Sequence, residues 1–201
     1  MAAIAKQFDV AEEDRLRANW YALLARLLAS APDAALLRKV ASMEGDESDF
    51  GRALKSLGAA AKATAVEAVT QEYFDLFIGV GGSELTPYGS YYLTGFLHEK
   101  PLARLRVDMA RLGITRAEGV AESEDHIAAL CDVMRGLITG TFGEPADLAT
   151  QRQFFDDHIG CWAPRFFEDL EAAKAAAFFM PVGTIGRLFM AVEAQAFEMA
   201  A

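Results

Sequence analysis

Hydrophobic residues recur along this chain at the three- and four-residue spacing of amphipathic helices. In the first stretch, 10–29, the spaced residues are Leu16, Trp20, Leu23, Leu24, Leu27 and Leu28, which share one face of a helix. Similar stripes follow at 32–43, 50–58, 64–77, 101–113, 123–138, 148–159, 162–170 and 181–197. No segment of strand length alternates apolar and polar positions with β-branched residues, so the pattern predicts an all-α fold.

Residues that favour helix ends lie between these stripes. Asp9 with Glu12, and Thr64 with Glu67, have the spacing of a capping box, so each pair predicts a helix start. The third predicted helix is expected to be short and to end near Gly58, because glycine is common just after a helix.

The 201 residues suit one domain of somewhat above average size. No linker of Pro, Gly or Ser divides the chain, and only 44–49 and 79–100 interrupt the helical pattern for long. We therefore expect a single all-helical domain over 1–201, a bundle of about nine or ten helices. In the last helix, Gly183 and Gly186 are expected to permit close packing against a neighbouring helix.

The net charge of −10 and the pI of about 4.8 argue against binding to nucleic acid or to an anionic membrane surface. No run approaches the ~18 uninterrupted apolar residues of a membrane span. The first residues lack the pattern of a signal peptide. Cys131 and Cys161, both within apolar helical stretches, are expected to be reduced, buried thiols. Together these features predict a cytoplasmic protein without stable membrane insertion.

The segment 72–92 is the most unusual part of the sequence. Tyr73, Leu76 and Phe77 share one helix face, and a glycine-rich break follows them. After the break, Pro87 introduces a segment with several tyrosines that is too polar and too interrupted for a core helix. A long loop with this many rings either packs onto its own core or presents the rings to a ligand. The residues alone leave both alternatives open.

The adjacent residues Asp125 and His126 suggest a catalytic pair, in which His126 is the general base and Asp125 is the acid that orients it. Neighbours in sequence do not face each other on a helix, however, so they cannot form that dyad by themselves. A structural reading is that Asp125 caps the helix N-terminus and His126 donates to a nearby loop. The alternative is a small helical hydrolase or metal-dependent enzyme that uses Asp125, His126 and His158, which would have to converge in one cleft. No phosphate-binding motif is present.

Three segments in order resemble the TorD/DmsD/NarJ family, the cytoplasmic chaperones of bacterial molybdoenzymes exported by the twin-arginine route. E-Y-F-D-L-F-I-G at Glu72–Gly79 is similar to the family's E-Y-x-x-L-F-x-G, and the loop with Pro87, Tyr88, Ser90 and Tyr91 is similar to its P-[WY]-E-S-x-Y. Glu122–His126 is similar to its E-P-x-D-H, and Phe155–Leu170 also fits the family pattern.

This chain departs from the family pattern at three places. Gly89 stands where the family has glutamate, Ser123 stands where it has proline, and Gly79-Val80-Gly81 replaces G-P-G. These departures bear on the identity of the partner and on contacts made by the loop.

The resemblance implies a binding protein and not an enzyme. Such chaperones hold the twin-arginine signal peptide of an apo molybdopterin oxidoreductase until the molybdenum cofactor is inserted. The resemblance implies no cofactor and no metal, although it allows weak guanine nucleotide binding, and it allows a monomer or a helix-exchanged dimer. The residues that would form or support the peptide site are Tyr73, Leu76, Phe77, Pro87, Tyr88, Ser90, Tyr91, Glu122, Glu124, Asp125 and His126.

The chemistry of these residues suits such a peptide. Its apolar face would lie in a groove lined by Leu76, Phe77 and Tyr88. Its arginine would be accepted by Asp125, together with an acid such as Glu122 or Glu124. We therefore expect the rings and the acids to line one cleft.

Overall fold

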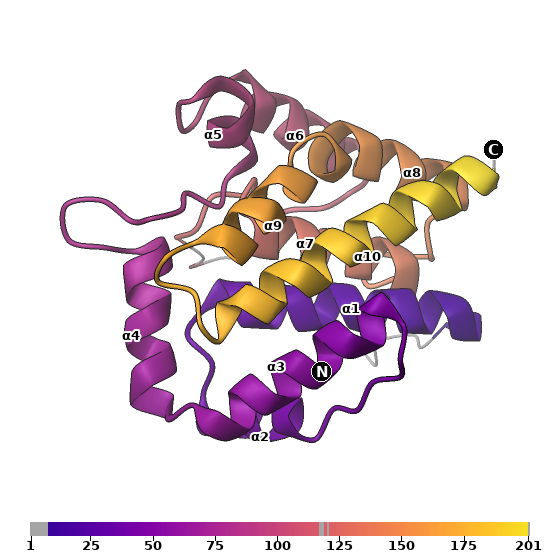
Figure 1. Ribbon diagram of the computed structural model, residues 1–201. Helices are drawn as coiled ribbons and strands as arrows, with labels where there is room; N and C mark the ends of the chain where they lie inside the picture. The colour runs from indigo at the N-terminus through magenta and orange to yellow at the C-terminus, as the bar shows by residue number, and fades with distance from the viewer. Residues whose placement is uncertain (1–7, 117–118, 120, 201) are drawn as a thin grey trace, which may run out of the picture. The chain divides into compact units, whose positions relative to one another are not determined.

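The computed structural model describes residues 8–116, 119 and 121–200 (Figure 1). Over these residues the chain forms ten α-helices and one π-helical turn. Within the same ranges no strand is formed, and the extended pairing is one isolated antiparallel bridge between Tyr88 and His126. The all-α prediction is confirmed. Residues 1–7, which the signal-peptide argument used, lie outside the described part.

The chain folds into two compact units, each assembled from two segments that are distant in sequence. The first unit contains residues up to Ala25 and Tyr88–Ile159, and the second contains Arg26–Pro87 and Gly160–Ala201. The expectation of a single domain over 1–201 stays a prediction. Besides the first part of α1 (Glu12–Ala29), the helices of the first unit are α5 (Gly89–Thr94), α6 (Lys100–Arg111), α7 (Ile127–Thr139) and α8 (Leu148–Phe155), followed by η1 (Asp156–Gly160). The helices of the second are α2 (Ala34–Ala41), α3 (Asp49–Ala63), α4 (Val66–Phe77), α9 (Ala163–Ala172) and α10 (Phe179–Met199).

The second unit is organised around α10, which packs along α9 and also contacts α3 (Figure 1). A Cβ added at Gly183 would lie 2.5 Å from the backbone nitrogen of Glu171 in α9. A Cβ at Gly186 would lie 2.1 Å from the ring of Phe167, which has no exposed surface. The close packing predicted for these two glycines is confirmed.

Gly183→Ala is expected to lower the free energy of unfolding by about 1–3 kcal/mol, because the added methyl would force the α9 backbone away from α10. Helix propensity alone would predict a gain of about 0.5–1 kcal/mol. Urea denaturation measures the difference. The exposed Gln195→Ala on the same helix is the control and should change stability by less than about 0.5 kcal/mol. A Gly183→Ala protein as stable as the parent would contradict the packing argument.

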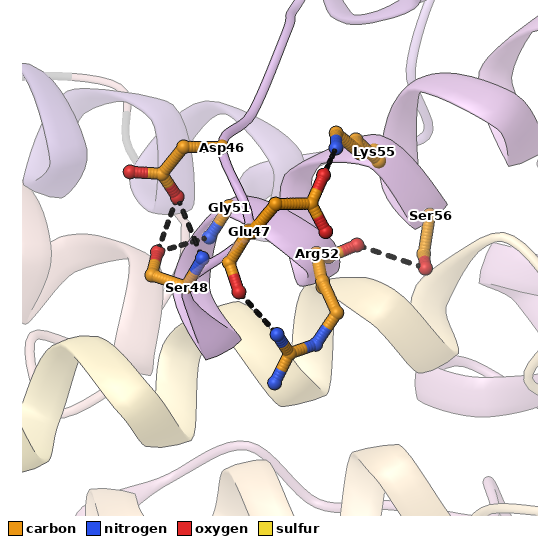
Figure 2. Close-up of polar contacts among 7 residues, drawn as sticks. All are labelled: Asp46, Glu47, Ser48, Gly51, Arg52, Lys55 and Ser56. Atoms are coloured by element: carbon orange, nitrogen blue, oxygen red, sulfur yellow. Dashed lines mark hydrogen bonds and ion pairs between the residues drawn. The ribbon is translucent and has the colours of Figure 1, made fainter.

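The acidic loop 44–49 caps the N-terminus of α3 (Figure 2). Ser48 is the N-cap, and its hydroxyl accepts from Gly51 N at 3.0 Å. Asp46 accepts from both the backbone nitrogen and the hydroxyl of Ser48. These bonds lower the pKa of Asp46. Asp46 therefore supports the cap of α3, whereas Glu47 and Asp49 pair with Lys55 and Arg52.

Several helix ends differ from the sequence-based expectation. α3 does not end near Gly58 but continues to Ala63, because the alanine-rich stretch is a good helix former. Thr64 donates to the Ala60 carbonyl and does not cap α4, whose N-cap, Ala65, has no side-chain bond.

Three further expectations are also corrected. α1 begins at Glu12, with Ala11 accepting from Arg15 N, so the predicted capping box with Asp9 is wrong. The tyrosine segment after Pro87, expected to be irregular, forms the short helix α5. Cys131 is buried, as expected, and burial raises the pKa of its thiol, whereas Cys161 is exposed.

Candidate functional site

In the first unit, the beginning of α5 lies against the turn that precedes α7. The two segments form the isolated bridge between Tyr88 and His126, in which Gly89 N donates to the Asp125 carbonyl at 2.9 Å. Two segments that the family motifs singled out, about 35 residues apart, thus meet through backbone bonds. This junction places the side chains of the candidate site.

Asp125 joins these two segments through its side chain as well. Asp125 is 4% exposed; its Oδ2 accepts from Ser90 N at 2.8 Å and its Oδ1 accepts from the Ser123 hydroxyl at 2.6 Å. Asp125 therefore holds the first turn of α5 and does not cap α7, contrary to the structural reading of the sequence. The hydroxyl of Ser90 is the buried side-chain polar atom that has no hydrogen-bond partner among the described residues.

His126 is the residue that caps α7. Its Nδ1 accepts from Ala128 N at 3.1 Å, so the donor role expected from the sequence is not the one seen at this nitrogen. Burial lowers the pKa of His126, opposed by the charges of Glu122 and Asp125. A neutral ring fits the acceptor role of Nδ1. The ring meets that of Tyr88 edge to face at 5.1 Å.

Glu122 is the exposed acid of this junction. Its Oε1 accepts from the Tyr88 hydroxyl at 2.6 Å and from Ser123 N at 3.2 Å. Ser123, at the position where the family pattern has proline, supplies this N–H and also a hydroxyl to Asp125. Proline could provide neither bond. The departure at this position therefore strengthens the local hydrogen bonding.

A recess of about 210 Å³ lies beside this junction. Its walls include Tyr88, Leu97, His98, Arg106, Arg116 and Glu122. Glu124 pairs with Arg106 through two bonds of 2.8 and 3.1 Å, and this pairing lowers the pKa of Glu124. Two acids of the predicted set are thus engaged within the chain, Asp125 with α5 and Glu124 with Arg106. Glu122 is the acid whose carboxylate is exposed at the recess.

The other predicted residues belong to the second unit. Tyr73 donates to the Leu28 carbonyl at 3.2 Å, and its ring contacts those of Phe77 and Phe179 at 5.0 and 5.9 Å. Leu76 has no exposed surface, and its carbonyl accepts from Leu85 N, which folds the glycine loop back onto α4.

Glu72 is a structural residue that sequence reasoning treated only as part of a motif. Its buried carboxylate accepts from three backbone nitrogens at the start of α10: Ala177 and Phe179 at 2.8 Å and Phe178 at 3.0 Å. Glu84 accepts from Lys174 N and Ala175 N in the same connection. A local sequence signal could not have identified this role, because α4 and α10 are about one hundred residues apart.

The predicted site residues therefore form two groups. Tyr88, Ser90, Tyr91, Glu122, Glu124, Asp125 and His126 lie in the first unit. Tyr73, Leu76, Phe77 and Pro87 lie in the second. A single groove lined by both groups stays a prediction.

The residues of the enzyme alternative have structural partners of their own. His158 Nε2 lies 3.1 Å from Asp108 Oδ2, and burial lowers the pKa of His158 against the effect of that bond. Asp125 and His126 have the roles described above. Across the described residues, no group of three or more His, Cys, Asp or Glu side chains could hold a metal ion.

The fold has a solved counterpart, a protein described as a candidate redox enzyme maturation protein from Archaeoglobus fulgidus. The TM-score is 0.56 at 19% identity, and the match covers 94% of this chain and 99% of the other. Residues 44–168, more than half of the chain, match the model of the nitrate reductase delta subunit family. The chain belongs to this family, which confirms the resemblance seen in its motifs.

Several curated relatives are named chaperone protein TorD. The protein from Aliivibrio salmonicida is 29% identical over 122 residues, 57% of each chain. The protein from Salmonella bongori is 28% identical over 167 residues, 82% of this chain and 76% of the relative. The chain spans little more than half the length of the first of these. Of the helices in the described ranges, none is long and apolar enough to cross a membrane.

Proposed function

We propose that this protein is a cytoplasmic chaperone for the maturation of a redox enzyme, and not itself an enzyme. It binds the twin-arginine signal peptide of a molybdenum-cofactor oxidoreductase until the cofactor is inserted. Family membership and the names of the relatives support the general role. The observation that supports peptide binding is the exposed carboxylate of Glu122, which Tyr88 orients at the recess.

The geometry at Glu122 suits one guanidinium group. Among the described residues, both hydrogen bonds that orient the carboxylate reach Oε1, so Oε2 can accept from an arginine. Arg106 and Arg116 line the same recess, and Glu124 already neutralises Arg106. Because Asp125 and Glu124 are engaged within the chain and Glu122 is the exposed acid of the recess, we expect one of the two peptide arginines to account for most of the electrostatic attraction.

Glu122→Gln is expected to weaken binding of a synthetic twin-arginine peptide about three- to tenfold, measured by calorimetric or fluorescence titration. An exposed ion pair contributes modestly, and tenfold in affinity is about 1.4 kcal/mol. The effect should shrink at high salt because the carboxylate is open to solvent. The control is Glu144→Gln, an exposed acid elsewhere in the first unit, which should leave affinity unchanged.

The peptide needs a matched control as well. A peptide in which both arginines are replaced by glutamine should bind the parent protein weakly, and Glu122→Gln should then have little further effect. If the parent protein does not bind the twin-arginine peptide, or binds both peptides equally, the proposed function is wrong.

A further inference from the structure

The end of α5 and the turn after it expose an unusual number of large apolar side chains. Tyr91, Leu93, Phe96 and Leu97 are 42%, 43%, 69% and 44% exposed, and we refer to these four residues as the α5 patch. Phenylalanine is normally among the most buried residues, and a cluster of exposed apolar side chains commonly marks a binding surface. The net charge of the chain is −10, yet residues 89–97 contain no charged side chain.

The α5 patch adjoins the recess at Glu122. Leu97 belongs to the patch and also lines the recess, as does the next residue, His98. α5 ends at Gly95 in the left-handed conformation, and the turn then leads to α6 (Figure 1). The neutral, apolar segment 91–97 therefore ends at a recess that contains the exposed acid Glu122 together with Arg106 and Arg116.

The receptor for the apolar part of a peptide was expected from the sequence to include Leu76. Leu76 has no exposed surface in this structure, so it can support a site but offers nothing for a ligand to cover. The α5 patch, in contrast, is exposed, and its last residue, Leu97, lines the same recess as Glu122.

From this arrangement we infer that the α5 patch receives the apolar stretch of the signal peptide while Glu122 accepts an arginine. This inference rests on the proposed function and assigns an orientation to the peptide. The occupant is a segment with a cationic end followed by uncharged apolar residues, because the recess holds the exposed carboxylate of Glu122 and the uncharged segment 89–97 leads to it through Leu97.

The test uses the full chain and compares variants of the patch with Glu122→Gln. Leu93→Ser and Phe96→Ser are the patch variants. Leu148→Ser is the matched control, because Leu148 lies in the same unit and is 43% exposed, as Leu93 is. Two peptides are titrated: an intact twin-arginine peptide, and one that keeps both arginines but has serine in place of the leucines of its apolar stretch.

The patch variants should weaken binding of the intact peptide about fivefold or more and should leave binding of the serine-substituted peptide nearly unchanged. Glu122→Gln should weaken the binding of both peptides. Leu148→Ser should leave the binding of both peptides unchanged. Melting temperatures close to that of the parent would show that the exposed substitutions leave the fold intact.

Three outcomes would overturn the inference. If Glu122→Gln weakens binding but both patch variants bind the intact peptide as the parent does, the proposed function stands and the assignment of the patch is wrong. If the parent protein binds neither peptide, the proposed function and the assignment of the patch are both wrong. If the patch variants convert a dimer to a monomer in sedimentation without loss of affinity, the patch is an interface between two copies of the chain.

Discussion

Glu72→Ala is expected to lower the free energy of unfolding by about 3 kcal/mol or more. The buried carboxylate accepts three backbone N–H groups where α10 begins, and α10 has no side-chain cap of its own. Removal of the carboxylate leaves three donors without a partner, and a buried donor left unsatisfied costs about 1–3 kcal/mol. For a chain of this size the melting temperature should fall by roughly 6–12 °C.

Two companion variants separate the capping role from a general loss of charge. Glu72→Gln keeps the shape and one acceptor oxygen, so it should cost about half as much as the alanine variant. Glu67→Ala removes an exposed acid from the first turn of the same helix and should cost no more than about 1 kcal/mol, the usual effect of a charge near a helix end. Thermal and urea denaturation measure all three. The capping argument fails if Glu72→Ala is no more destabilising than Glu67→Ala.

The periodic apolar stripes were sufficient to predict the all-α fold, because burial of one helix face depends on spacing within a segment. The spacing of Gly183 and Gly186 also predicted the close packing of the last helix. They could not predict what caps α10, since the acceptor, Glu72, lies in α4 and is brought there by tertiary structure. Rules for local capping detect only acceptors within a few residues of the helix start.

The same limit explains the errors at the candidate site. Asp125 precedes α7 in sequence, so it was interpreted as the cap of that helix, but its carboxylate accepts from Ser90 at the start of α5. With that N–H satisfied, a segment that looked too broken for a helix forms α5. The second and third family motifs selected residues that meet around Tyr88, but the roles of these residues depend on pairings across about 35 residues that no local pattern contains.

Asp125→Ala is expected to have the largest effect on the candidate site. It would leave Ser90 N and the Ser123 hydroxyl without their acceptor, at a cost of about 3 kcal/mol, and would release the first turn of α5 from the turn before α7. Because α5 positions both the recess and the α5 patch, we expect peptide affinity to fall more than about tenfold. Affinity should be measured well below the melting temperature, so that unfolded protein does not contribute.

Asp125→Asn distinguishes this structural role from direct contact with a peptide arginine. The amide oxygen can still accept from Ser90 N, and the amide nitrogen can donate to the Ser123 hydroxyl, so most of the stability and affinity should remain. A carboxylate that binds guanidinium directly would behave in the opposite way: the asparagine variant would lose affinity as fully as the alanine variant while remaining almost as stable as the parent. Measurement of melting temperature and peptide affinity for both variants therefore decides between the two roles, and a stable Asp125→Asn protein that no longer binds the peptide would contradict the structural one.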